Sequence, residues 1–115
     1  LKNDFIIPLK KSIEHLQAAL MFFMQNGLKN PLSAVSGATD FLHLVGLVSL
    51  GFIWSKKAQS AKEKLKDISA NKNFLEAKIL TGSYFMHRQL PETKLRLDRI
   101  LTGEKQVMSL AADQF

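Results

Sequence analysis

The sequence contains no cysteine, and among its 115 residues there are only three prolines, one tryptophan and one tyrosine. Without cysteine the chain can form neither a disulfide nor a thiolate metal site, which fits a cytoplasmic protein. So few prolines, together with six glycines, exclude a Pro/Gly-rich disordered chain. Alternating runs of β-branched residues, which would indicate strands, are also missing. The length fits one domain, residues 1–115, that can bury a single hydrophobic core.

Motifs that carry chemistry are missing as well. The sequence has no HExxH, GxSxG, GxxxxGK[ST] or GxGxxG. No two of the three histidines, His15, His43 and His87, are four residues apart, as a helical metal-ligand pair would be. We expect His43, inside an apolar run, to be a hydrogen-bonded core residue. The sequence therefore assigns no catalytic, cofactor-binding or metal-binding residue.

The N-terminal stretch LKNDFIIPLKK does not match a secretory signal, because its apolar part is short and contains a proline. The chain also starts with Leu1 rather than methionine. We therefore expect it to be a fragment of a longer protein.

Apolar residues recur at intervals of three and four, which predicts helices. Six of them form one stripe in the first segment: Ile6, Leu9, Ile13, Leu16, Leu20 and Phe23. This helix should start between Asp4 and Pro8 and end at Asn26-Gly27. Asn30-Pro31 then opens a second helix of about 35 residues, with no breaker before Asp67.

The C-terminal part predicts two further helices. Asn71 or Asn73 can cap the third, on which we expect these residues to face inward: Phe74, Ala77, Thr81, Tyr84 and Phe85. Leu90-Pro91 breaks it, because the residue before a proline avoids the helical conformation. The fourth, from about Pro91 to Leu101, would bury Leu90, Leu97, Leu101 and neighbouring Ile100, and EKQVMSLAA would add final turns. The fold class is therefore all-α, an up-and-down bundle of four main helices.

The stretch FLHLVGLVSLGFIW, residues 41–54, carries no charge. It is shorter than the roughly 20 apolar residues of a membrane span, so we expect no span and a helix surrounded by others. Its core stripe would be Gly37, Phe41, Leu44, Val48, Gly51, Ser55 and Ala58. Glycine in a helix costs about 1 kcal/mol relative to alanine. We therefore expect neighbouring backbones to come close at Gly46 and Gly51, where leucine would overfill the site.

The net charge of +6 would attract nucleic acid, anionic lipid or an acidic partner. A basic run follows the apolar stretch, with candidate anion or phosphate contacts at Lys56, Lys57, Lys62 and Lys66. A solvated helix end also explains this run. It lacks interleaved aromatics and a helix-turn-helix signature, so no nucleic acid is expected. The alternative function nevertheless stays an independent helical module that binds an acidic partner or nucleic acid through these lysines.

The segments FLHLVGLVSLGFIWSKKA and FLEAKILTGSYFMHRQLPETKLRLDRILTGEKQVMSL resemble the extra C-terminal helical domain of one subgroup of flavin-dependent acyl-CoA dehydrogenases. The matching features, in chain order, are Phe41-Leu42, Gly46, Gly51, Phe74 with Lys78, Phe85 with Leu90-Pro91, and Gly103 before the last helix. Two features depart from the pattern: Phe41 stands where the family often has tyrosine, and the end of the second helix is unusually rich in lysine.

The resemblance implies a parent enzyme that uses FAD to oxidise an acyl-CoA thioester to the 2,3-enoyl-CoA. In that family a glutamate removes the α-proton and the flavin accepts the β-hydride, and both belong to the main body of the enzyme. The present chain would then bind no cofactor and would be inactive alone. Its implied helix-packing residues are Phe41, Leu42, Gly46, Gly51, Phe74, Phe85 and Pro91. Its implied partners are the upstream dehydrogenase body and a second subunit of a homo-oligomer, whose packing it would support.

Overall fold

The computed structural model describes residues 2–26 and 31–102, and no strand occurs in these two ranges. This confirms the all-α class. The elements are, in chain order, the π-helical segment η1 (Lys2–Ile6) and the α-helices α1 (Ile7–Asn26), α2 (Pro31–Lys64), α3 (Lys72–Arg88) and α4 (Glu92–Thr102).

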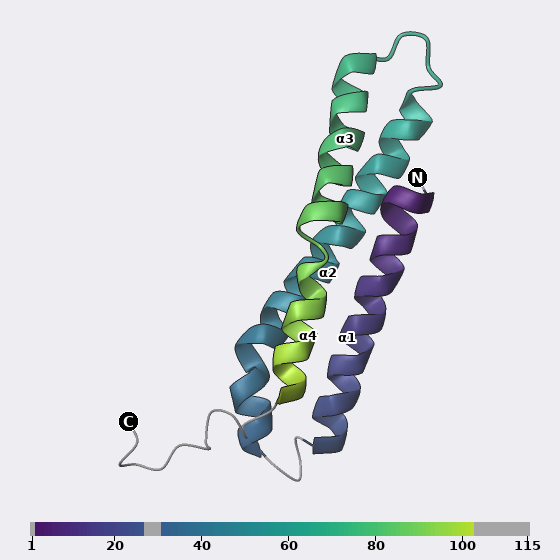
Figure 1. Ribbon diagram of the computed structural model, residues 1–115. Coiled ribbons are helices and arrows are strands. Elements are labelled where there is room, and N and C mark those ends of the chain that lie inside the picture. The colour runs from purple at the N-terminus through teal and green to yellow at the C-terminus, as the bar shows by residue number, and fades with distance from the viewer. Residues whose placement is uncertain (1, 27–30, 103–115) are drawn as a thin grey trace, which may run out of the picture.

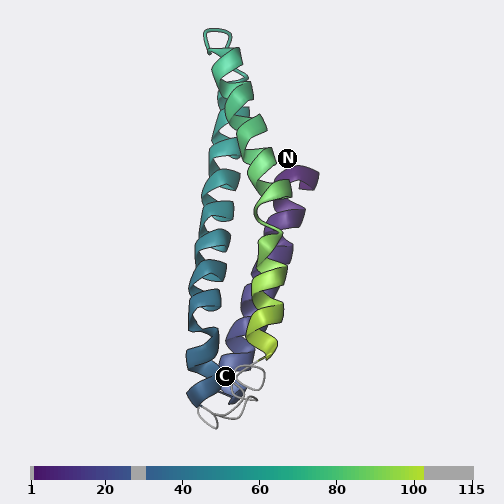
Figure 2. The same ribbon diagram turned by 60° about the vertical axis from the view of Figure 1, so that its left-hand side comes forward.

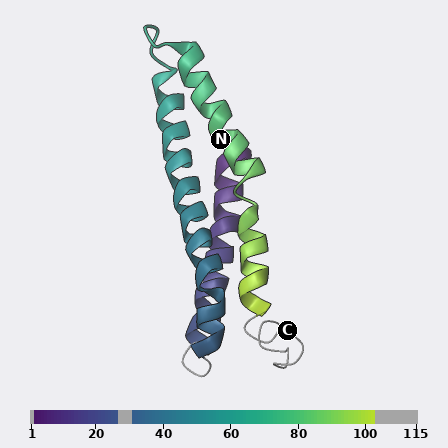
Figure 3. The same cartoon turned by 90° about the vertical axis from the view of Figure 1, so that its left-hand side faces the viewer.

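The helices form three rods in an up-and-down arrangement. α2 runs along the whole bundle, and α3 and α4 return beside it one after the other as a single broken rod (Figure 1). α1 packs on α2 and α4, while η1 lies at the base of the hairpin that α2 and α3 form (Figures 2 and 3). The four predicted helices are all present. Only α1, α2 and α4 pack side by side as a group of three, because α3 lies beyond the end of α4 along the same rod.

The helix ends follow the local sequence signals. α1 ends at Asn26 and α2 begins at Pro31, as expected, whereas the predicted cap at Asn30 lies outside the described residues. Asn71 caps α3, because its side-chain oxygen accepts a hydrogen bond of 3.2 Å from the N–H of Phe74. The final turns predicted for EKQVMSLAA also lie outside the described residues.

The break between α3 and α4 falls at the predicted Leu90-Pro91 step. The N–H groups of Gln89 and Leu90 both donate to the carbonyl of Phe85, at 2.9 Å each. Pro91 has no N–H to continue this pattern, and the helix restarts at Glu92. The break turns one potential helix into two and lets α4 tilt onto α1.

The core consists of two clusters along α2. The cluster near η1 contains Phe5, Ala58, Phe85, Met86 and Leu90, and the one near the start of α2 contains Ala19, Leu44, Val48, Leu97 and Ile100. All seven residues of the predicted α2 core stripe are buried or half-buried, which confirms the predicted inner face of this helix. The predicted burial of Leu90, Leu97 and Ile100 is also confirmed, whereas Leu101 is exposed.

The expectation that other helices surround α2 is wrong. Leu42 is 72% exposed, and Val35, Phe52 and Ile53 are exposed as well. His43, expected in the core, is exposed too. Within the described residues one helix, Val35–Lys64, is long and apolar enough by length and composition to cross a membrane, and 28% of its apolar window is buried. The other two rods, α1 and α3–α4, cover only one side of α2, and the described elements include no fourth rod to cover the other.

The predicted inner stripe of α1 is only partly correct. Leu9, Leu16 and Phe23 are half-buried, but Ile6, Ile13 and Leu20 are exposed. The residues that are buried instead lie beside the stripe: Phe5, Ser12 and Ala19. Close packing of α1 between α2 and α4 favours small residues, and the Ser12 hydroxyl is satisfied by donating to the carbonyl of Leu9 at 2.7 Å.

On α3 most of the predicted inward face is wrong. Phe74 is 56% exposed and Tyr84, Ala77 and Thr81 are also exposed, whereas Phe85 is buried as expected. α3 contacts only α2 and the short η1–α1 start, so it has a narrow covered face. The exposed rings are instead covered in part by cations, with Lys78 Nζ 5.3 Å from the Phe74 ring centroid and Arg88 5.7 Å from that of Tyr84.

Candidate functional site

The side of α2 that faces away from the other helices carries a second regular pattern. Six exposed residues recur there at alternating spacings of four and three: Val35, Thr39, Leu42, Gly46, Ser49 and Ile53. We call these six residues the outer seam. None of them is charged, and between residues 35 and 55 the one charged residue is Asp40, which belongs to the inner face.

Two shallow apolar hollows lie where α2 meets η1 and α1, next to the outer seam. One is lined by Leu20, Phe23, Ala38, Phe41, Leu42 and Val45, and the other by Phe5, Ile6, Leu9, Phe52, Ser55, Lys56 and Gln59. We call these two hollows together the α1/α2 groove. Lys56 is the one charged residue among these linings, and its ammonium lies 5.5 Å from the Phe52 ring centroid.

On the other side of α1, a cavity of about 460 Å³ lies against the break between α3 and α4. Its walls include Pro8, Met86 and Leu90, and its polar lining includes Lys11, His15 and Lys94. The Nδ1 atom of His15 lies 2.9 Å from the Thr93 hydroxyl. Burial lowers the pKa of His15 below its usual value, and the neighbouring positive charges of Lys94 and Lys11 lower that pKa further. His15 is therefore neutral at pH 7.

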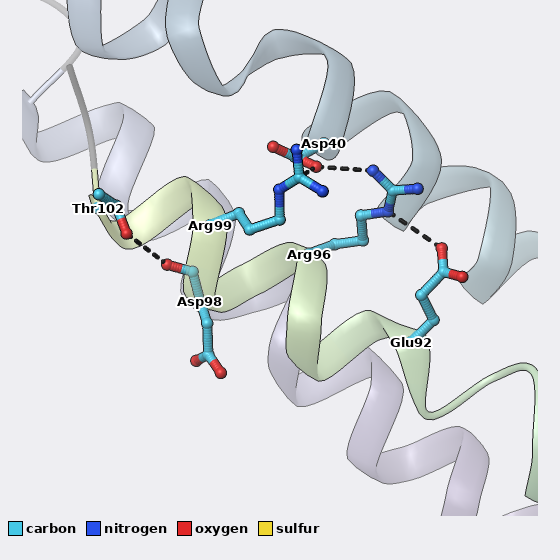
Figure 4. A network of polar contacts seen from close by, with 6 residues as sticks. All are labelled: Asp40, Glu92, Arg96, Asp98, Arg99 and Thr102. Carbon is cyan, nitrogen blue, oxygen red and sulfur yellow. Dashed lines mark hydrogen bonds and ion pairs between the residues drawn. The ribbon is translucent and has the colours of Figure 1, made fainter. Parts of the chain in front are cut away.

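A network of ion pairs joins α2 to α4 (Figure 4). Asp40 is 7% exposed, and its Oδ1 accepts a hydrogen bond of 2.7 Å from Nη1 of Arg96 and lies 3.4 Å from Nε of Arg99. Nε of Arg96 also donates to Glu92 at 3.0 Å. The hydrogen bonds to Asp40 and Glu92 raise the pKa of Arg96 above its usual value. The network fixes α4 against the first half of α2 and satisfies Asp40, the one acid between residues 35 and 55 of that helix.

The predicted helix-packing residues fall into two groups. Gly51, Phe41 and Phe85 pack as expected: a Cβ on Gly51 would lie 3.2 Å from Leu90, and the rings of Phe41 and Phe23 meet edge to face at 5.2 Å. The others do not pack within the described chain, because Leu42, Gly46, Phe74 and Pro91 are exposed. At Gly46 an added Cβ would meet no atom of the described residues within 4 Å, so the expectation of a close backbone there is wrong for this part of the chain.

Gly82, which the sequence reasoning did not single out, is the tightest of these glycine contacts. A Cβ on Gly82 would lie 2.9 Å from Cε1 of Phe5 and 3.0 Å from Cε3 of Trp54. At this point α3, α2 and η1 meet. The signal was available, since a glycine inside a helix with no nearby turn indicates a close neighbour.

The four candidate anion-binding lysines do not come together on one face. Successive helical residues are about 100° apart, so Lys56, Lys57 and Lys62 point in three directions around α2, and Lys66 follows the end of that helix. The ammonium of Lys57 lies 5.1 Å from the Trp54 ring centroid, and Lys66 pairs with Glu63 at 3.8 Å. Anion binding at these lysines stays a prediction.

Histidine and carboxylate side chains are likewise dispersed. Nε2 of His87 lies 3.0 Å from Asp4, His15 contacts Thr93, and His43 is exposed. Across residues 2–26 and 31–102 no three His, Cys, Asp or Glu side chains form a group that could hold a metal ion.

These features define a class of protein: a three-rod helical domain with exposed apolar surfaces between and beside its helices. The chain belongs to the acetyl-CoA dehydrogenase C-terminal-like family, whose model matches residues 2–111. This agrees with the resemblance to the C-terminal helical domain of acyl-CoA dehydrogenases that the sequence carries. A search of curated proteins found no match to this chain.

Proposed function

We propose that this chain is a non-catalytic, cytoplasmic accessory domain of an FAD-dependent acyl-CoA dehydrogenase. In this proposal the parent enzyme oxidises an acyl-CoA thioester to the 2,3-enoyl-CoA, and the domain docks on the body of that enzyme and supports its assembly. The family match supports the parent enzyme. The observation that supports docking is the exposed, almost uncharged α1/α2 groove.

The groove has the composition of a surface that is buried in a larger protein. Ile6, Leu20 and Phe52 are each about half exposed along it. Fully burying side chains of this kind is worth about 1.5–3 kcal/mol each. Monomeric soluble proteins rarely expose large contiguous apolar patches, and those that they do expose are often interaction sites.

A membrane span by α2 fits this fold poorly. α1 and α4 lie along the first half of α2 (Figures 1 and 3), and they expose Lys10, Lys11, Glu14 and Lys94. A bilayer around α2 would also enclose these charges, at a cost of about 2.5–3.5 kcal/mol or more for each at the bilayer centre. We therefore propose a protein partner for the groove and no membrane span.

Docking can be tested with the dehydrogenase body expressed without this domain. The wild-type chain, added separately, should bind the body in a calorimetric titration. Phe52→Glu should weaken that binding at least tenfold, because it places a charge in the α1/α2 groove without filling a core position. Leu80→Glu is the matched control: Leu80 is also apolar and exposed but lies on α3, so its change should leave the affinity unaltered.

Two outcomes would contradict the proposal. One is that the wild-type chain does not bind the body at any concentration at which both are soluble. The other is that Phe52→Glu and Leu80→Glu weaken binding equally, since the groove would then have no special role.

A further inference from the structure

Nothing in residues 2–26 and 31–102 explains why Gly46 is a glycine. It lies in the middle of α2, where glycine costs about 1 kcal/mol relative to alanine, yet an added Cβ would meet nothing within 4 Å. Four residues earlier on the same face, Leu42 is 72% exposed. A large apolar side chain and a gap therefore lie side by side on an open helix face.

We propose that two copies of this chain pair through the outer seam of α2, with the two helices antiparallel. The alternating four and three spacing of the seam is that of helices packed as a left-handed pair. With the two-fold axis beside residue 44, Leu42 of each copy packs over Gly46 of the other. Val35 then meets Ile53 of the second copy at both ends of the contact.

Charge permits the pair and favours its antiparallel orientation over a parallel one. The chain carries +6, but its outer seam is uncharged, so pairing brings no like charges into the contact. Lys56 follows the end of the seam, and in an antiparallel pair the two Lys56 residues lie about 36 Å apart at 1.5 Å per residue. That is several Debye lengths at physiological salt, whereas a parallel pair would place these lysines together.

The contact is small. From Val35 to Ile53 the seam is about 27 Å long and one helix wide, which is at or below the low end of the roughly 1,200–2,000 Å² that specific interfaces bury. We therefore expect a reversible pair that is populated at about micromolar concentrations or above. The outer seam shares Leu42 with one hollow of the α1/α2 groove but does not include Phe52, so Phe52→Glu tests the docking and Gly46→Glu tests the pair separately.

The absence of cysteine allows a direct test with single cysteines introduced into the full chain. In the antiparallel pair Val35→Cys and Ile53→Cys on different copies come within disulfide distance, while two copies of the same variant keep their cysteines about 27 Å apart. Under mild oxidation a mixture of the two variants, distinguished by a size tag, should give the mixed dimer, and each variant alone should give little. Cross-linking of each variant alone would indicate a parallel pair and overturn the proposal.

Sedimentation velocity provides the second readout. Gly46→Glu should remove concentration-dependent dimerisation, and it should leave the fold intact because the site is open. Leu80→Glu should dimerise as the wild type does. A wild-type chain that stays monomeric up to hundreds of micromolar, or that remains monomeric and co-sediments with lipid vesicles, would overturn the proposal.

Discussion

Two helical glycines, Gly82 and Gly46, allow packing to be separated from backbone propensity. Both should gain about 1 kcal/mol of helix stability on replacement by alanine. At Gly46 no atom of the residues that the structure describes lies within 4 Å of the new Cβ, so no contact there opposes that gain. At Gly82 the Cβ would lie 2.9 Å from the Phe5 ring and 3.0 Å from the Trp54 ring. Overpacking of this kind costs about 1–3 kcal/mol, so we expect Gly46→Ala to stabilise the chain and Gly82→Ala to destabilise it or leave it unchanged.

The difference between the two variants is therefore about 1–3 kcal/mol in the free energy of unfolding. For a domain of this size that corresponds to about 4 °C in Tm for each kcal/mol. Urea unfolding can be followed by circular dichroism and by the fluorescence of Trp54, the one tryptophan, which touches the Gly82 site. The measurement should be made below micromolar protein, where the proposed self-association is small. Equal shifts of the two variants, in either direction, would refute the packing argument.

Three further predictions concern the core, the ion-pair network and pH. Phe85→Ala should destabilise the chain by about 3–5 kcal/mol because Phe85 is buried. Phe74→Ala on the same helix should change stability by less than about 0.5 kcal/mol. Similar losses of unfolding free energy for the two variants in urea would contradict this. Asp40→Asn should lower Tm more than Asp98→Asn, because Asp40 is buried between two arginines while Asp98 pairs with an exposed lysine. If Asp40→Asn lowered Tm by no more than Asp98→Asn, the ion-pair network would not be stabilising. The pKa of His15 should lie below its usual value in an NMR titration. The folded state disfavours protonation of His15. Its contribution to stability should therefore be present above about pH 6.5 and be lost as the pH falls through the folded-state pKa. A pKa of His15 at or above the usual value would contradict the burial assigned to it.

The sequence predicted the parts of this fold that local physics determines. Asn71 caps a helix start through its side chain and Pro91 causes a helix break because it lacks an N–H; residue type and position predicted the break at Leu90-Pro91 and the cap at Asn71 or Asn73. The inner stripe of α2, from Gly37 to Ala58, was also identified, because residues at the helical period must lie on one face whatever covers them. These features need no knowledge of the other helices.

The covered faces of the other helices could not be predicted in the same way. Whether Phe74 or Phe85 is buried depends on how many rods surround α3, and a helix that is apolar all round gives no sign of which side remains open. The pairing of Asp40 with Arg96 joins residues 56 positions apart, so the sequence showed only an unexplained acid before an apolar run. Gly46 looked like a packing site for the same reason that Gly51 did. The two differ because Gly51 faces Leu90 and Leu9 on the other two rods, whereas Gly46 faces neither rod.

The most direct test of the account compares this chain with the whole protein that contains it, purified in the same way. We predict that the whole protein carries visible flavin and reduces an electron-accepting dye with an acyl-CoA substrate. The chain alone should be folded, colourless and inactive in the same assay. A chain that carries flavin by itself, or that reduces the dye with acyl-CoA, would contradict its assignment as an accessory domain.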